Sequence, residues 1–174
     1  MCPLIFGDEM LELVRTNIQF DDFKAEFEPH YVEETNQSVD ACIHIVRSEN
    51  DSDESDLLRY DEKAPQFPLA QTFAYTAEQE FKGDLARLYY QIVYYKRKFV
   101  TYPQGKYFEG KDRFYTCLQG EATIRVGKLQ EPVRAGDMWW LDVTKEQSIL
   151  NTGKSNLIGL VFDLHESEWR SQWT

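Results

Sequence analysis

Six short apolar runs follow one another at regular spacing in the second half of the chain. They are separated by turn residues such as Gln119-Gly120, Gly127-Lys128 and Ala135-Gly136-Asp137. Short strands punctuated in this way predict a β-sandwich or barrel. Because helices are expected only upstream, we predict a mainly β (α+β) fold: a double-stranded β-helix, or jelly roll, with N-terminal helices packed on it. The predicted strands are 113–118, 122–126, 131–133, 138–142, 148–151 and 157–164.

The first half of the chain carries three patterns with helical spacing. Met10, Leu11, Leu13 and Val14 predict one or two helical turns opened by Asp8. Phe20, Phe23, Phe27 and Tyr31 lie on one face of a helix that begins at Asp21-Asp22, where acidic residues suit the helix N-terminus. The apolar stripe from Phe81 to Tyr95 predicts a helix from Ala77 into Tyr94-Tyr95, although a strand competes near its end.

Other upstream segments favour strands or loops. The β-branched run 41–46 predicts a buried strand, 72–75 a short strand, and 99–102 a strand followed by the turn 103–105. The segment 48–62 is too acidic and polar to be buried, so we expect an exposed loop.

We expect a single domain over 1–174. Residues 1–95 would supply N-terminal helices and strands with the acidic loop 48–62, residues 96–164 the jelly-roll core, and 165–174 a tail. No apolar run is long enough to span a membrane, and no signal-peptide pattern opens the chain. The expected location is therefore the cytoplasm. Cys2, Cys42 and Cys117 show no metal-binding spacing and are expected to be free thiols.

The charge is unevenly distributed along the chain. The formal net charge is −11; residues 1–80 hold 19 acidic and five basic side chains, whereas residues 81–174 hold 11 acidic and 14 basic ones. This balance argues against general binding to nucleic acid or to an anionic membrane. A solvated face would explain the acidic half, but so would a surface for a basic protein, with Asp51, Asp53, Glu54 and Asp56 as candidate contacts.

Four segments together resemble the C-terminal half of aspartyl/asparaginyl β-hydroxylase-type jelly-roll dioxygenases. They are Arg113-Phe-Tyr-Thr-Cys-Leu118, Val133-Arg-Ala-Gly-Asp-Met-Trp-Trp-Leu-Asp142, Gln147-Ser-Ile-Leu-Asn151 and Leu157-Ile-Gly-Leu-Val-Phe-Asp-Leu164, and the resemblance covers about 96–164. It implies a jelly roll that binds Fe(II) and 2-oxoglutarate. A looser similarity to cupins implies the same fold.

The chain departs from that family where the chemistry would lie. Gln147 stands at the position of a histidine ligand, Leu157 at that of the arginine that binds the 2-oxoglutarate carboxylate, and Lys111-Asp112 near the family's His-x-Asp. An ammonium has no lone pair, and an amide is a poor iron ligand. Only Arg113 matches a position that can bind 2-oxoglutarate, and Tyr115 stands where a histidine often lies near the metal. We therefore expect no metal and no catalytic residues.

The remaining candidate residues give no second site. His30, His44 and His165 have no metal-motif spacing, and no GxSxG, P-loop or GxGxxG is present. Trp139 and Trp140 are adjacent, so on a strand they point to opposite faces, and one of them would line the barrel mouth or pack under a neighbouring element. Trp169 and Trp173 lie four residues apart and suit one face of a short terminal helix.

Three hypotheses follow. We favour a non-catalytic jelly-roll binding protein, an inhibitor or adaptor module whose acidic half contacts a basic protein. The first alternative is a metal-free pocket for a small anionic ligand, lined by Arg113, Tyr115, Arg125, Trp140 and Gln147. The second is a divergent Fe(II)- and 2-oxoglutarate-dependent dioxygenase. An edge strand and the terminal tryptophans would also allow a homodimer.

Overall fold

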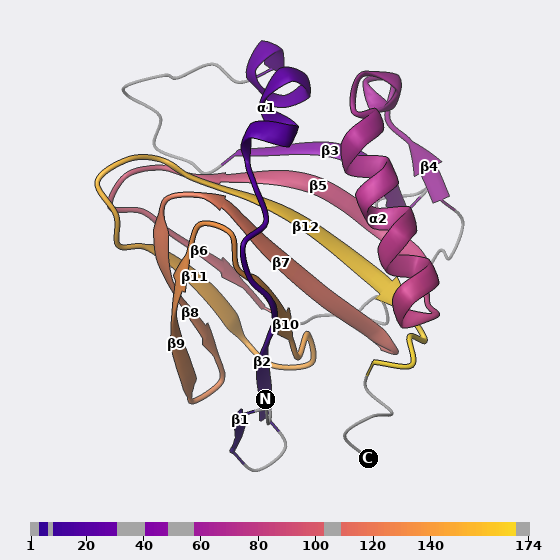
Figure 1. The fold of residues 1–174 in the computed structure, drawn as a ribbon. Coiled ribbons are helices and arrows are strands. Elements are labelled where there is room, and N and C mark those ends of the chain that lie inside the picture. The colour runs from indigo at the N-terminus through magenta and orange to yellow at the C-terminus, as the bar shows by residue number, and fades with distance from the viewer. Residues whose placement is uncertain (1–3, 7–8, 31–40, 49–57, 103–108, 170–174) are drawn as a thin grey trace.

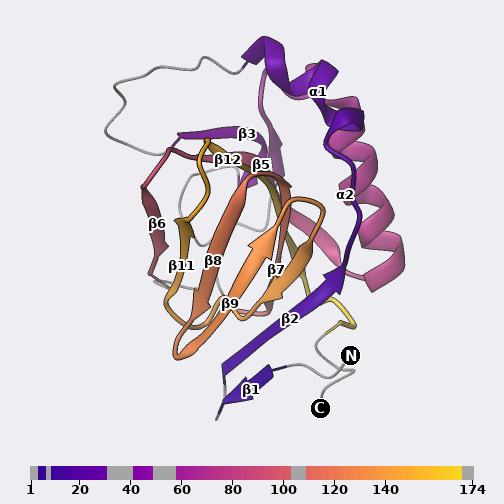
Figure 2. The same ribbon diagram turned by 60° about the vertical axis from the view of Figure 1, so that its left-hand side comes forward.

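Two facing antiparallel sheets form the body of the protein, and helices cover the outer face of the larger sheet (Figures 1 and 2). A computed structural model describes residues 4–6, 9–30, 41–48, 58–102 and 109–169. In chain order, its elements are β1 Leu4–Phe6, β2 Glu9–Arg15, α1 Asp21–Phe27, the 3₁₀ helix η1 Glu28–His30, β3 Ala41–Ser48, β4 Leu58–Tyr60, the 3₁₀ helix η2 Ala64–Gln66, α2 Pro68–Phe81, β5 Asp84–Val93, β6 Lys98–Thr101, β7 Lys111–Gln119, β8 Glu121–Val126, β9 Leu129–Arg134, β10 Met138–Leu141, β11 Gln147–Asn151 and β12 Leu157–His165.

The strand order is that of a double-stranded β-helix. The larger sheet runs β1-β2-β10-β7-β12-β5-β3-β4 and the smaller sheet β6-β11-β8-β9. From β5 to β12 the pairs are nested: β5 pairs with β12, β6 with β11, β7 with β10 and β8 with β9, all antiparallel. This nesting of eight strands in two sheets defines the jelly roll. The predicted fold class is confirmed, and so are the six predicted strands from 113 to 164.

Side chains alternate between two cores along the strands of the larger sheet. Trp139 contributes to the core between the two sheets, and the next residue, Trp140, to the core beneath the helices. The prediction that the two indoles point to opposite faces is confirmed. The same alternation places Tyr115 and Val161 between the sheets and Phe114 under the helices.

The helices lie on the outer core through small and aromatic side chains. Ala70, Ala74, Ala77 and Phe81 form the buried stripe of α2, and Phe23 and Phe27 are the buried residues of α1. Alanines at this spacing let the α2 backbone approach the sheet closely. The helix predicted from Asp21-Asp22 is confirmed as α1. No helix in the described residues is long and apolar enough to cross a membrane.

Three upstream predictions are wrong. The segment expected to form helical turns after Asp8 is strand β2, which pairs with β10. Residues 72–75, expected to form a strand, lie inside α2. A helix was expected from Ala77 to Tyr95, but α2 ends at Phe81, and the next residue, Lys82, adopts the left-handed conformation. The chain then forms strand β5. The jelly roll thus starts at β5, upstream of residue 96.

The strand and loop predictions between 41 and 105 have mixed outcomes. The strands expected at 41–46 and 99–102 are confirmed as β3 and β6. The expected loop 48–62 contains strand β4 near its end, because Leu58–Tyr60 pairs with β3. Residues 49–57, the turn 103–105 and Trp173 lie outside the described residues.

Candidate functional site

The interior of the jelly roll contains a buried ion pair. Strands β7 and β12 place Arg113 and Asp163 directly opposite each other, facing the smaller sheet. Arg113 Nε donates to Asp163 Oδ1 at 2.7 Å, and a terminal guanidinium nitrogen donates to Oδ2 at 2.8 Å. Their side chains are 6% and 0% exposed. A bidentate pair of this kind satisfies both carboxylate oxygens and neutralises the only cation that the sequence suggested for an anionic co-substrate.

Of the other predicted site residues, Gln147 contacts this ion pair and Tyr115 borders the same void. Gln147 Oε1 accepts a hydrogen bond from Arg113 at 3.4 Å. The Tyr115 ring lies against the backbone of Gly159, so closely that a Cβ at position 159 would be 2.4 Å from the ring. Burial raises the pKa of the Tyr115 hydroxyl well above its ordinary value, so the phenol stays protonated. The structure thus brings Arg113, Tyr115 and Gln147 together.

The space left among these side chains is very small. The void that they border has a volume of about 10 Å³, which suits about one water molecule. Three buried polar atoms of bordering residues, Gln91 Oε1, Tyr115 Oη and Gln147 Nε2, have no hydrogen-bond partner in the described part of the chain. This void is therefore bordered by polar atoms but has no room for a small organic ligand.

The residues in this interior do not fit Fe(II) and 2-oxoglutarate. Asp112 points to the other face of the sheet, where it accepts hydrogen bonds from Trp140 Nε1 at 3.2 Å and Ser167 Oγ at 2.6 Å. Asp163 already accepts both hydrogen bonds from Arg113. No group of three His, Cys, Asp or Glu side chains arranged to hold a metal ion occurs in the described ranges.

The three histidines lie on separate elements. His30 in η1 packs against Phe67, with ring centroids 4.7 Å apart, and His44 in β3 lies 5.4 Å from the Tyr89 ring. His165 ends β12, and its ring lies near Gly110. Aromatic packing accounts for the first two, as expected for single histidines among apolar neighbours.

The other predicted ligand residues lie away from the barrel interior. Arg125 is exposed on β8, and its Nε donates to the Gly127 carbonyl at 2.7 Å. Trp140 is buried under the helices, so it does not line the barrel mouth. The candidate partner contacts Asp51, Asp53, Glu54 and Asp56 lie outside the described residues.

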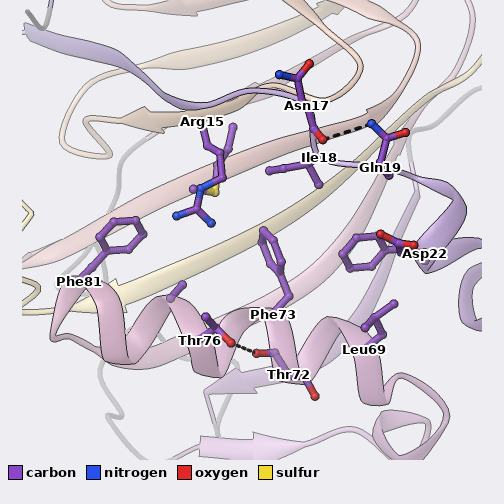
Figure 3. A pocket seen from close by; sticks show the side chains of 13 residues that line it. Arg15, Asn17, Ile18, Gln19, Asp22, Leu69, Thr72, Phe73, Thr76 and Phe81 are labelled. Carbon is purple, nitrogen blue, oxygen red and sulfur yellow. Dashed lines mark hydrogen bonds between the residues drawn. The ribbon is translucent and has the colours of Figure 1, made fainter. Parts of the chain in front are cut away.

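A much larger cleft opens on the opposite side of the larger sheet, and the sequence did not predict it. It lies between α2 and the connection from β2 to α1, and its volume is about 560 Å³ (Figure 3). Phe23, Phe73, Phe81, Ile18 and Met138 supply its apolar surface. The strand predicted at 72–75 concealed this cleft, because it divided the single helix α2 that carries both Phe73 and Phe81.

Comparisons with known proteins give partial matches to structures of the same fold class. A predicted oxalate decarboxylase from Thermotoga maritima is 20% identical, with a TM-score of 0.41 over 51% of this chain and 73% of that one. The Cnp3 cupin domain of Schizosaccharomyces pombe is 12% identical, with a TM-score of 0.40 over 45% and 55%. A double-stranded β-helix protein from Klebsiella pneumoniae is 15% identical, with a TM-score of 0.40 over 48% and 70%.

Searches by sequence add nothing to this picture: no protein-family model and no curated protein matches the chain. The nested strand pairing remains the basis for the cupin-like fold. The finer resemblance to aspartyl/asparaginyl β-hydroxylases stays a prediction.

Proposed function

We propose that this protein is a non-catalytic recognition module built on a jelly-roll scaffold. One observation supports the proposal above others: the void that the buried Arg113 and Tyr115 side chains border in the barrel interior has a volume of only about 10 Å³, and Arg113 is already paired with Asp163. Substrate and metal would need this space in a jelly-roll oxygenase. The same observation weighs against the two alternatives, an iron- and 2-oxoglutarate-dependent hydroxylase and an interior binder of small anions.

The proposed partner is a protein with a basic surface. The acidic N-terminal half, with 19 acidic and five basic side chains in residues 1–80, favours a cationic partner by long-range attraction. Asp51, Asp53, Glu54 and Asp56 are the proposed contacts, as in an inhibitor or adaptor module acting in the cytoplasm.

A metal titration tests the non-catalytic part. Mn(II) added to the purified chain is followed by electron paramagnetic resonance, and Fe(II) with 2-oxoglutarate is added without oxygen and followed by visible absorption. We expect no bound manganese signal and no charge-transfer band. Stoichiometric manganese that an excess of 2-oxoglutarate perturbs would overturn the proposal.

A matched pair of variants tests the partner surface. The first changes Asp51, Asp53, Glu54 and Asp56 to the corresponding amides. The second changes four exposed acidic residues elsewhere, Asp21, Glu28, Glu62 and Glu121, by the same total charge. A partner is captured from cell extract, identified, purified and titrated calorimetrically against both variants.

We expect at least a tenfold weaker affinity for the first variant and less than a threefold change for the second. Equal loss in both would indicate net charge rather than a local surface. Unchanged binding in both would remove the acidic segment from the proposal.

A further inference from the structure

We propose that the cleft between α2 and the β2–α1 connection binds a small organic amine: a largely apolar, preferably aromatic, molecule carrying an ammonium group. This inference is independent of the basic protein partner, because it uses other residues and another class of ligand. It rests on the volume of the cleft, its apolar surface and the kind of polar atoms at its rim.

The dimensions and surface of the cleft suit a small molecule. Its volume of about 560 Å³ falls within the range of roughly 300–1,000 Å³ that is typical of ligand pockets. Phe73 and Phe81 project from α2 on one side, and Ile18 projects from the β2–α1 connection on the other (Figure 3). Such a surface favours a flat apolar group, and aromatic rings also attract cations over their faces.

The hydroxyl groups at the rim of the cleft are left as acceptors. Thr72 Oγ1 donates to the Pro68 carbonyl, and Thr76 Oγ1 donates to the Thr72 carbonyl, each at 2.9 Å. A hydroxyl has one proton, so the capacity left toward the cleft is that of an acceptor. A ligand that donates hydrogen bonds is favoured over one that accepts them.

The amides at the rim add to this preference. Gln19 uses an N–H to donate to the Asn17 carbonyl at 3.2 Å, and Asn17 uses one to donate to Thr16 Oγ1 at 3.2 Å. Both side-chain carbonyl oxygens remain acceptors. One N–H on each amide also remains, so these two residues can bind a ligand group that donates or one that accepts a hydrogen bond. The preference for a hydrogen-bond donor therefore comes from the threonine hydroxyls.

The charges at the two ends of the cleft differ. Arg15 donates to both carboxylate oxygens of Glu80 at 2.7 Å, so the cation at this end is neutralised within the protein. Asp22 lies at the far end, at the start of α1 (Figure 3). An ammonium near Asp22 would gain a favourable interaction, whereas a carboxylate would be repelled there and, beside Arg15, would also meet the Glu80 carboxylate.

Three probes with one ring system test the charge preference. Naphthylethylamine, naphthylethanol and naphthylacetic acid are titrated into the full chain at neutral pH, and their dissociation constants are measured by ligand-observed NMR. We expect the amine to bind at least tenfold more tightly than the acid, with the alcohol between them. Equal affinities for amine and acid, or no binding by any probe up to millimolar concentration, would overturn the proposal.

Paired variants locate the site. Asp22→Asn is expected to weaken the amine at least threefold and leave the alcohol unchanged, whereas Asp21→Asn, an equal change of charge outside the cleft, should leave both unchanged. Thr76→Arg is expected to abolish binding because the longer side chain fills the cleft. Thr76 is exposed, so we expect this variant to fold. Tyr75→Arg, on the exposed side of α2, is its control. Equal effects within either pair would overturn the assignment of this cleft.

Discussion

Arg113 and Asp163 face each other across strands β7 and β12, and two hydrogen bonds of 2.7 and 2.8 Å join them in the interior of the jelly roll. Breaking such a pair on one side leaves a buried charge without a partner. Asp163→Asn is therefore expected to lower the free energy of unfolding by about 3–5 kcal/mol. Urea denaturation followed by circular dichroism measures the change.

The control for this prediction is the exposed pair between Arg15 and Glu80, whose side chains are 40% and 45% exposed. Glu80→Gln is expected to cost no more than about 1 kcal/mol, because water screens that pair. A cost for Asp163→Asn as small as that for Glu80→Gln would contradict the view that the interior ion pair is held without solvent.

The contact between Gly159 and Tyr115 predicts a strong steric effect. A Cβ at position 159 would lie 2.4 Å from the Tyr115 ring, so Gly159→Ala must displace the ring or the strand. We expect a loss of about 1–3 kcal/mol in the free energy of unfolding. Tyr115→Leu combined with Gly159→Ala should recover part of that loss, and strict additivity in this double-mutant cycle would argue against the contact.

The end of helix α2 predicts a stabilising substitution. Lys82 has a φ of 50°, in the left-handed region that glycine adopts without strain. Lys82→Gly is expected to raise the free energy of unfolding by up to about 1 kcal/mol, because its exposed ion pair with Glu168 contributes little. Gln79→Gly, inside the same helix, should instead destabilise by about 1 kcal/mol. Thermal unfolding distinguishes the two, and equal signs would contradict the assigned helix end.

Glu12 predicts a pH-dependent stability. Burial raises the pKa of this carboxyl from 4.5 to about 7. Between these values the folded state keeps a proton that the unfolded state releases, so this residue's contribution to stability falls as the pH rises toward 7 and stays low above it. Glu12→Gln should therefore stabilise the protein by about 1–3 kcal/mol above neutral pH and have little effect in acid below both pKa values. Unfolding free energies of both proteins across that range check this, and a pH-independent difference would be inconsistent with it.

The strands from residue 113 onward could be predicted from the sequence because the turns between them are explicit. Gly120, Gly127 and Gly136 all adopt positive φ at the strand ends, as the spacing of turn residues suggested. β5 could not be predicted in the same way. It is buried on both faces along most of its length, so its apolar residues do not alternate with polar ones and also fit a helical period.

The candidate sites were also predictable only in part. Arg113 and Tyr115 could be predicted to share a face because they alternate on one strand, and Gln147 could be expected near them because it begins a strand of the facing sheet in a jelly roll. That Asp163 neutralises Arg113 could not be predicted, because the register of β7 with β12 depends on the whole sheet. The outer cleft could not be predicted either, since it depends on the identity of α2 as a helix and on the path of the chain before α1.

The nested order of strands also dictates when each part of the chain can find its partner during synthesis. The innermost pair, β8 with β9, is a hairpin of neighbouring residues, whereas the outermost pair joins Asp84 to His165. Closing the long loop costs more entropy than closing the short one. During synthesis, β5 can pair with β12 only after β12 has left the ribosome. Until then, Phe81 of α2 lacks the β7 and β12 side chains that it packs against in the folded protein.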